Sequence, residues 1–317
     1  MQETSIFVGV DVAKAELVTA AYGDTASGVI ANECAAIEHW LASLPAGTYV
    51  AMESTGIYHR LLAERAHAAG MRVYVLNARD VYFYAKALGA RGKTDRVDAR
   101  LIARYVAEHH ARLHCWQPGE GAQARIQELM LRRAQLVTKR VSMRQTLKGC
   151  SELSAQQVQL EQAFDELLQA LDARVLALIE ADQVLSAGRK SLSTITGFGP
   201  QASALLTAVL SRMQFANADA LVAYSGLDPR ANDSGTRRGR RRLSKRGPPA
   251  LRRQMFLVAF AASHSKALKP LYQSIRLKGF ASTQALVILA RKLLRVAYAV
   301  YKSGKPFEPS RFLAKPA

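Results

Sequence analysis

Strand-like and helix-like segments alternate over about the first 115 residues of this chain, and strand-like segments then disappear. Short apolar runs typical of strands span residues 6–11, 16–22, 28–32, 48–53 and 72–76. Helical patterns span residues 35–44, 58–69 and 93–109. The resulting order, β-β-β-α-β-α-β-α, predicts an α/β domain with a mixed sheet flanked by helices.

The middle of the chain is helical in pattern. Apolar residues recur at helical spacing on both sides of a break near residues 149–154. They are Ile126, Leu129, Leu136, Val137 and Val141 before the break, and Val158, Phe164, Leu167, Leu168, Leu171, Val175 and Leu178 after it. We expect two long helices that fold back as a hairpin, with an apolar stripe that could close on itself or on a second protomer.

The last part is mainly helical and begins with a glycine-rich turn. Gly197-Phe198-Gly199-Pro200 precedes a helical segment at residues 201–210. Glycines allow a backbone to approach a partner closely, and the N–H groups that open a helix can bind phosphate. A plain corner between two packed helices would show the same residues. These changes of pattern predict three parts, at residues 1–117, 118–188 and 189–317.

The charge of the chain favours a polyanionic partner. Its 317 residues include 44 Lys and Arg against 25 Asp and Glu, a net charge of +19. Such a field attracts nucleic acids and speeds their encounter. An anionic membrane would compete, but the apolar stretch at residues 285–301 contains Arg291, Lys292 and Arg295 and is too short and too charged to span a bilayer.

Cysteine usage favours a reducing, cytoplasmic location. Cys34, Cys115 and Cys150 lie far apart and form no C-x-x-C pair, which argues against a disulfide framework or a zinc site. The first apolar run is short and leads straight into Asp11, so we expect no secretory signal.

A dense basic segment lies between residues 230 and 253, with Asp233 as its one acid. Charge runs are usually solvated faces. This one lies between two apolar segments, residues 220–227 and 255–262, so we expect a loop held inside the fold, which favours phosphate binding. The basic residues are Arg230, Arg237, Arg238, Arg240, Arg241, Arg242, Lys245, Arg246, Arg252 and Arg253.

Four carboxylates have positions that suit a metal-binding site. Asp11 and Glu53 end two strand-like runs, and Asp95 and Asp98 lie three apart at a helix start, on one helical face. Mg²⁺ prefers oxygen ligands, and two Mg²⁺ ions about 4 Å apart can stabilise the attacking and leaving oxygens of a phosphoryl displacement. Any one of these acids alone is better explained as a strand end or helix cap, but the four together predict a metal site.

Ser244 is a second candidate, within Arg242-Leu243-Ser244-Lys245-Arg246. A serine hydroxyl is a poor nucleophile unless a neighbour lowers its pKa or removes its proton. No histidine-containing triad is spaced around it. From spacing alone, an ordinary loop serine or a phosphate-binding serine is the better interpretation.

Two sets of motifs carry a resemblance to a known family. The first set is Gly9-Val10-Asp11-Val12-Ala13-Lys14, Met52-Glu53-Ser54-Thr55-Gly56 and Lys93-Thr94-Asp95-Arg96-Val97-Asp98-Ala99. The second is Gly197-Phe198-Gly199-Pro200, Tyr224-Ser225-Gly226-Leu227-Asp228-Pro229, Ser234-Gly235, and Leu243-Ser244-Lys245-Arg246-Gly247 through Leu251-Arg252. With both sets in order, nearly the whole chain resembles the DEDD transposases of the insertion sequence 110 family, relatives of Piv-type DNA invertases.

The resemblance implies a RuvC-like, RNase H-type N-terminal domain in which Asp11, Glu53, Asp95 and Asp98 bind Mg²⁺. It implies a coiled-coil dimerisation element, then a C-terminal transposase domain whose Ser244 forms a phosphoserine link to DNA. Family members are guided by a structured bridge RNA that pairs with donor and target DNA. They act as homodimers pairing into homotetramers, with one protomer's acids meeting another's serine. The resemblance also implies the bacterial cytoplasm, in association with the nucleoid.

We therefore interpret the chain as a Mg²⁺-dependent, bridge-RNA-guided DNA recombinase or transposase of a mobile element. The sequence leaves open the target DNA, the guide RNA, the number of protomers and whether Ser244 acts in cis or in trans. The alternatives are a Piv-like invertase, a RuvC-like junction nuclease that uses water as nucleophile, and a non-catalytic nucleic-acid-binding protein. The residues expected to bind nucleic acid are Arg237, Arg238, Arg240, Arg241, Arg242, Lys245, Arg246, Gly197 and Gly199.

Overall fold

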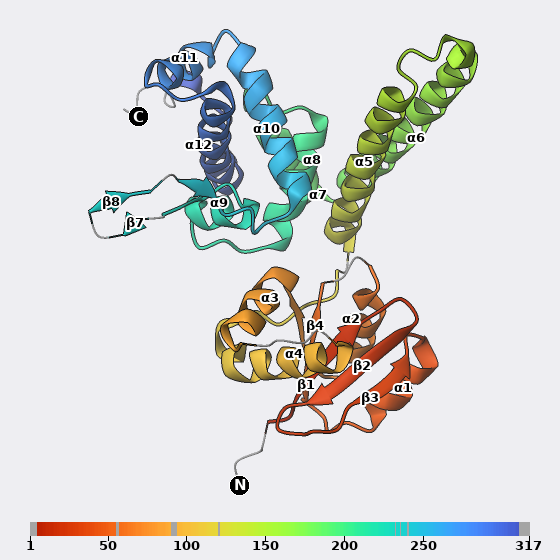
Figure 1. Cartoon of the computed structure of the whole chain (residues 1–317). Helices are drawn as coiled ribbons and strands as arrows, with labels where there is room; N and C mark the ends of the chain where they lie inside the picture. Colours follow the sequence, from red (N-terminus) through yellow and green to blue (C-terminus); the bar gives the residue numbers. More distant parts are fainter. Residues whose placement is uncertain are drawn as a thin grey trace. The chain divides into compact units, whose positions relative to one another are not determined.

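The computed structural model describes residues 5–54, 57–89, 94–119, 121–231, 233–234, 236–239 and 241–310. The chain divides into two compact units, Met1–Pro118 and Gly119–Ala317 (Figure 1). In the part of the chain that the structure describes, no helix is both long enough and apolar enough to cross a bilayer.

The first unit contains a five-stranded mixed sheet, which confirms the fold class predicted for this part. The strand order is β3-β2-β1-β4-β5; β1–β2 and β2–β3 are antiparallel, and β1–β4 and β4–β5 are parallel. The elements are β1 (Phe7–Val12), β2 (Glu16–Ala21), β3 (Gly28–Ala31), α1 (Cys34–Ala42), β4 (Tyr49–Glu53), α2 (His59–Ala68), β5 (Arg72–Leu76), α3 (Ala78–Ala87) and α4 (Asp95–His109).

One helix, α3, is absent from the sequence-based expectation. The aromatic run Tyr82-Phe83-Tyr84 lies within it. Its start does carry a signal, since the Asn77 side chain accepts a hydrogen bond of 3.0 Å from the backbone N–H of Arg79, as an N-cap residue does.

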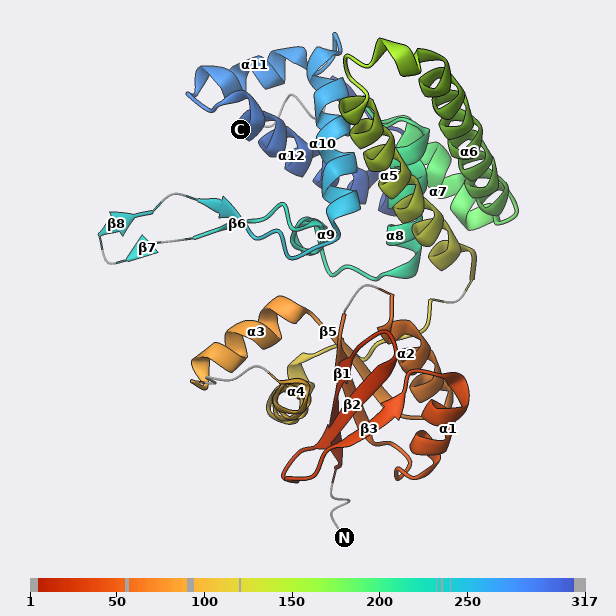
Figure 2. The same cartoon turned by 45° about the vertical axis from the view of Figure 1, so that its right-hand side comes forward.

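Helices cover both faces of the sheet (Figure 2). On one face, Val10, Met52 and Val73 are buried with residues of α1 and α2, including Ile37 and Leu62. The other face carries Tyr49, Ala51 and Tyr74 under α3 and α4, where Val81 and Ile102 are buried. The alternation of buried residues along β1 and β4 follows from the period of two in a strand.

Helix α4 packs directly on β1 because Gly9 has no side chain. A Cβ atom built on Gly9 would overlap Ala99 O and Ala103 N of α4. Small residues on both sides therefore let the helix backbone approach the strand backbone. Gly9 therefore allows α4 to lie close over β1.

The Gly9→Ala variant tests this contact. We expect it to lower the free energy of unfolding of the first unit by about 1–3 kcal/mol, because the methyl group forces α4 away from the strand. Urea denaturation followed by circular dichroism measures the change. Ala31→Val, which adds bulk at an exposed position of β3, is the matched control and should leave stability nearly unchanged. Equal stability of the Gly9→Ala variant and the native protein would contradict the packing argument.

The second unit is mainly helical. Two short antiparallel strand pairs, β6–β9 and β7–β8, form a ribbon that extends from its helices (Figures 1 and 2). The elements are α5 (Gly121–Thr146), α6 (Ser154–Glu180), α7 (Gln183–Ser193), α8 (Pro200–Arg212), α9 (Ala218–Ser225), β6 (Pro229–Arg230), β7 (Asp233–Ser234), β8 (Arg237–Arg238), β9 (Arg242–Leu243), α10 (Pro249–His264), α11 (Lys269–Leu277) and α12 (Ser282–Ser303).

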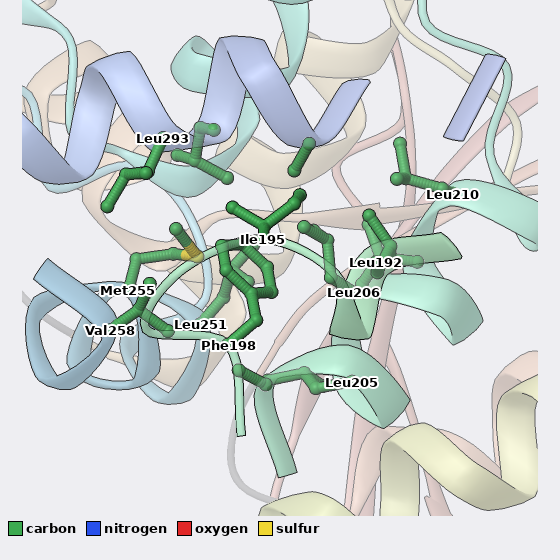
Figure 3. Packing of buried hydrophobic residues seen from close by; sticks show 14 of the residues in the cluster. Leu192, Ile195, Phe198, Leu205, Leu206, Leu210, Leu251, Met255, Val258 and Leu293 are labelled. Carbon is green, nitrogen blue, oxygen red and sulfur yellow. The ribbon is translucent and has the colours of Figure 1, made fainter. Parts of the chain in front are cut away.

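A single large core holds this unit together. Figure 3 shows Ile195 at its centre, between side chains of α7, α8, α10 and α12 such as Leu192, Leu206, Met255 and Leu293. The base of the α5–α6 hairpin belongs to the same core, through residues such as Ile126, Leu129, Met130, Val175 and Ile179. The hairpin is therefore anchored to the C-terminal helices rather than packed by itself.

Charged pairs fix the register of the antiparallel α5–α6 hairpin. Arg133 Nε lies 2.7 Å from Asp172 Oδ1, and Arg140 Nη1 lies 2.6 Å from Asp165 Oδ1. Farther from the core, Arg140 and Arg144 both pair with Glu161. The apolar stripe is buried near the core but not at the far end, where Val158 is 56% exposed and Val141 and Leu167 are also exposed.

Glu161 gives this hairpin a dependence on pH. Hydrogen bonds from Arg144 and then Arg140 lower its pKa to about 2. A carboxyl group whose pKa falls on folding stabilises the fold above its unfolded value, about 4.3, and this contribution is lost as the pH falls through about 2. We expect hydrogen-exchange protection in the far part of the hairpin to fall across that window, and less steeply in Glu161→Gln.

The measurement is amide exchange of residues 140–161, corrected for the intrinsic pH dependence of exchange. Glu166→Gln, at an exposed position of the same helix, is the control and should titrate like the native protein. Parallel curves of exchange protection against pH for the native protein and Glu161→Gln would contradict the assignment of this pH dependence to Glu161.

Candidate active site

Asp11 and Glu53 lie side by side at one edge of the sheet. The parallel pairing of β1 with β4 places Val10 opposite Met52, and Asp11 and Glu53 are the next residues of the two strands. Both side chains are half-buried. They lie two residues beyond Gly9 and Ala51, so both point to the face that α4 covers.

Helix α4 brings the other two acids to the same face. Asp98 lies four residues before the buried Ile102, and Asp95 lies four before the buried Ala99, so both acids continue the sheet-facing side of the helix. The Thr94 hydroxyl caps the helix by accepting a hydrogen bond of 3.3 Å from Val97 N. Asp98 is half-buried and Asp95 is exposed.

Contacts at the two ends of α4 show how far along the strands its first turn lies. The His110 ring, just beyond the helix, lies 5.0 Å from the Phe7 ring and 5.2 Å from the Tyr49 ring, at the beginnings of β1 and β4. At the other end, Ala99 is buried with Val18, the β2 residue directly opposite Asp11. The first turn of α4 therefore starts near the level of Asp11.

The four acids are suitable ligands for a metal ion, but their side chains are not gathered around one point. Carboxylate oxygens are the ligands that Mg²⁺ prefers. Among the described residues, however, no three His, Cys, Asp or Glu side chains converge closely enough to hold a metal ion. The backbone gathers the acids at one edge, and the side chains would have to rotate toward a common point to bind an ion.

Ser244 is held against an aspartate that the sequence interpretation did not single out. Its Oγ donates a short hydrogen bond to Asp228 Oδ1, and its backbone N donates one of 2.9 Å to Asp228 O. Arg246 N makes a long contact of 3.5 Å with the same Oγ. Ser244 is only 3% exposed. Asp228 lies inside the motif Tyr224–Pro229, and that position was the only available signal.

Close backbone packing fixes the loop after Ser244. A Cβ atom on Gly247 would overlap Tyr224 O, so this loop lies directly on the end of α9. Lys245 N donates to Gly226 O at 3.0 Å, and Lys245 has φ = 54°, in the left-handed region that side chains disfavour. The Arg252 guanidinium donates to Ser225 O and Gly247 O, and burial lowers its pKa.

The expected nucleic-acid-binding arginines fall in and around the ribbon. Arg242, Lys245 and Arg246 are exposed next to Ser244, whereas Arg241 pairs with Asp233 at 2.8 Å. Arg237 and Arg238 form β8. Their side chains, and the whole of Arg240, lie outside the part of the chain that the structure describes.

The glycine-rich turn has a packing role. Gly197 has φ = 95°, and a Cβ atom there would lie 2.6 Å from Val258 O of α10. Gly199 is the N-cap of α8, whose first helical residue is Pro200. The close approach of α10 is enough to explain why residue 197 is a glycine. The space around Gly199 is open enough for a contact with a binding partner.

Two exposed aromatic rings lie on α3. Tyr82 is 53% and Phe83 51% exposed. Lys86 Nζ lies 4.8 Å from the centre of the Tyr82 ring, and Arg79 Cζ lies 5.4 Å from that of Phe83. Tyr84 instead donates a hydrogen bond of 2.7 Å to Glu108. Tyr82 and Phe83 thus keep surface that bases could stack on, and Tyr84 does not share it.

Comparison with known proteins identifies the relatives of this chain. The DEDD transposase model of the IS110 type, described as "Transposase", matches residues 8–152, and the "Transposase IS116/IS110/IS902 family" model matches residues 189–273. The first match contains the four acids, and the second contains Ser244 and Asp228.

Individual relatives agree with these models. The chain is 30% identical over 271 residues to the pilin gene-inverting protein of Moraxella bovis, an alignment that covers 82% of each chain. The protein of the same name from Moraxella lacunata gives the same figures. An "insertion element IS110 uncharacterized 43.6 kDa protein" of Streptomyces coelicolor is 34% identical over 148 residues, which is 46% of this chain and 36% of that protein.

The Gly247→Ala variant tests whether backbone packing holds the serine loop. We expect it to lower the free energy of unfolding of the second unit by about 1–3 kcal/mol, because the methyl group would overlap Tyr224 O. Gly199→Ala, with open space around the added methyl group, is the control and should cost less than about 1 kcal/mol through its N-cap position. Thermal unfolding measures both, and equal losses would contradict the argument.

Proposed function

Because the chain belongs to the IS110 family of DEDD transposases and is a DNA recombinase or transposase, we propose that it cuts and rejoins DNA through Ser244 with Mg²⁺ bound by its acids. The ligands would be Asp11, Glu53, Asp95 and Asp98. The observation that carries this proposal is that two separate candidate sites, an acidic sheet edge and an anchored serine loop, each fall within a matched transposase model.

The acidic edge supports the metal-binding part. Asp11 and Glu53 lie on neighbouring parallel strands and face α4, whose first turn carries Asp95 and Asp98. The mixed strand order also supports a RuvC-like, RNase H-type domain. Bound Mg²⁺ would make the phosphorus more electrophilic and offset charge on the attacking and leaving oxygens.

The surroundings of Ser244 support its role as nucleophile. A covalent phosphoserine intermediate conserves the energy of the phosphodiester, so strands can be rejoined without ATP. The exposed Arg242, Lys245 and Arg246 would offset charge that develops on the phosphate. Since Ser244 is only 3% exposed, attack requires neighbouring residues to move aside.

The partners would be double-stranded donor and target DNA, a bridge RNA and further copies of the chain. The net charge of +19 supports a broad nucleic-acid surface that reads backbone shape while RNA pairing reads sequence. The exposed apolar residues in the far part of the α5–α6 hairpin support its use as a coiled-coil dimerisation element. In such an assembly the acids of one protomer would act with Ser244 of another.

DNA inversion is a second candidate, because relatives that match 82% of this chain are named for inverting a pilin gene. The two functions share the same chemistry and differ in the DNA on which they act. A structured noncoding segment and movable ends next to the gene would favour transposition. Two inverted sites around a switchable gene would favour inversion.

Ser244→Ala and Asp11→Asn test the chemistry together. The substrate is plasmid DNA carrying the sequences that flank the gene, with RNA transcribed from them and Mg²⁺. We expect Ser244→Ala to form no covalent protein–DNA adduct, and Asp11→Asn to lose at least about 10³-fold in cleavage rate. Removal of Mg²⁺ by EDTA should have the effect of Asp11→Asn. Adducts are detected by denaturing electrophoresis of labelled DNA.

The controls are Ser142→Ala on the exposed side of α5 and Asp24→Asn in the turn after β2, both of which should remain active. Continued cleavage by Ser244→Ala would indicate a junction nuclease that uses water. Full activity of Asp11→Asn would exclude the acids as metal ligands, and a protein that binds DNA without cutting it would leave the recombinase proposal without support.

A further inference from the structure

We propose that Asp228 is the general base that takes the proton from Ser244 when the phosphoserine bond forms. This inference rests on the proposed role of Ser244 as nucleophile. The observation behind it is the contact between the two side chains, which are 16 residues apart in sequence. Neither the matched family models nor the names of the relatives assign a role to Asp228.

The contact is directional. The Ser244 hydroxyl donates to Asp228 Oδ1, so its hydrogen points to the carboxylate. The backbone N–H of Arg246 approaches the same Oγ from another side and occupies an acceptor position. A second hydrogen bond, from Ser244 N to Asp228 O, fixes the two residues at the backbone as well. The pair is thus aligned before any substrate binds.

Asp228 is the adjacent base for Ser244 that the sequence alone did not reveal. An unactivated serine hydroxyl is a weak nucleophile, and an adjacent base is the usual remedy. In the part of the chain that the structure describes, Ser244 Oγ has hydrogen bonds with Asp228 and Arg246 and none with a histidine. A carboxylate within hydrogen-bond reach of the proton it must remove meets the geometric requirement for a general base.

The proposed step balances with water as the one further reactant. The proton moves from Ser244 Oγ to Asp228 Oδ1, the Oγ–P bond forms, and the bond from phosphorus to the leaving deoxyribose oxygen breaks. The leaving oxygen takes a proton from water. When the strand is rejoined, a deoxyribose hydroxyl attacks the phosphoserine and gives its proton to hydroxide or water. The bond from phosphorus to this oxygen forms, the Oγ–P bond breaks, and protonated Asp228 returns its proton to Ser244 Oγ.

A carboxylate beside the scissile phosphate would repel it unless cations lie nearby. Arg252 clamps the same loop through Ser225 O and Gly247 O. Arg291, on α12, is within electrostatic range of Asp228: burial and then Arg295 lower its pKa, while Asp219 and Asp228 act in the opposite direction. Its Nε atom is buried and has no hydrogen-bond partner among the described residues. These cations would offset the charge of the acid and the phosphate together.

The test compares Asp228→Asn, Asp228→Ala and Ser244→Ala on plasmid DNA carrying the sequences that flank the gene, with the RNA transcribed from them. The readout is the single-turnover rate of covalent adduct formation, with DNA binding by anisotropy and thermal unfolding measured on each variant. Asn keeps an oxygen that accepts the same hydrogen bond but cannot take up the proton. We expect Asp228→Asn to lose roughly 10²–10⁴-fold in adduct rate with DNA binding and unfolding temperature unchanged.

The matched control is Asp219→Asn on α9, which removes the same charge near Arg291 but does not contact Ser244. We expect it to form adducts at close to the native rate. A fast Asp228→Asn with a slow Asp228→Ala would show that Asp228 only positions the hydroxyl, and the general-base assignment would be wrong. Equal losses of adduct rate in Asp228→Asn and Asp219→Asn would show that Asp228 contributes only its charge. That result would also overturn the general-base assignment.

The outcomes for the two proposals remain separate. If the native protein and Ser244→Ala both form adducts, or neither does, then the nucleophile is not Ser244 and the proposed function fails. If only Ser244→Ala loses adducts while Asp228→Asn keeps the native rate, the proposed function stands and the inference about Asp228 alone is wrong.

Discussion

Direct contact between the backbones of α4 and β1 at Gly9 is the constraint on which the first unit depends. Because no side chain separates them, the helix lies close over the strand, and its first turn begins near the level of Asp11. The sheet register independently places Glu53 next to Asp11. The position of the four acids thus follows from the sheet register and from packing between small neighbouring residues such as Gly9 and Ala99.

The second unit positions Ser244 by the same physical means. Gly247 lets the loop after Ser244 lie on the end of α9, and Arg252 ties the two together through backbone oxygens. Asp228 lies three residues after the end of α9 and is thereby brought to Ser244. In both units, a glycine removes the steric bulk that would keep a functional residue from its neighbours.

Local pattern was sufficient to predict most elements. Strands such as residues 72–76 carry dense apolar, β-branched runs, and the hairpin of α5 and α6 carries a sustained helical period. α3 was missed because its aromatic run suggests no single period. The basic segment was expected to be a loop, but part of it forms the two strand pairs β6–β9 and β7–β8. The sequence did not predict these strands, because strands of two residues leave no periodic signal.

The candidate site could be predicted only in part, for a physical reason. The acids and Ser244 are each marked by their own residue type and by motifs that resemble a family. Asp228 also lies in one of these motifs, but its pairing with Ser244 is seen only in a contact between residues 16 positions apart. A contact of that kind depends on how α9, β6 and β9 pack. Likewise, the packing of Gly197 against α10 is visible only in the structure, while phosphate binding by the N–H groups that open α8 stays a prediction.

The burial of Ser244 has a consequence for the host cell. An enzyme that can sever chromosomes is dangerous whenever it meets DNA by chance, and a strongly cationic chain meets DNA often. Under the proposed chemistry, the buried Ser244 hydroxyl could not reach a phosphate in the resting protein, which could then slide along DNA without nicking it. Cleavage would then wait for a rearrangement that exposes Ser244, so the protection would lie in the fold and not in the rarity of encounters.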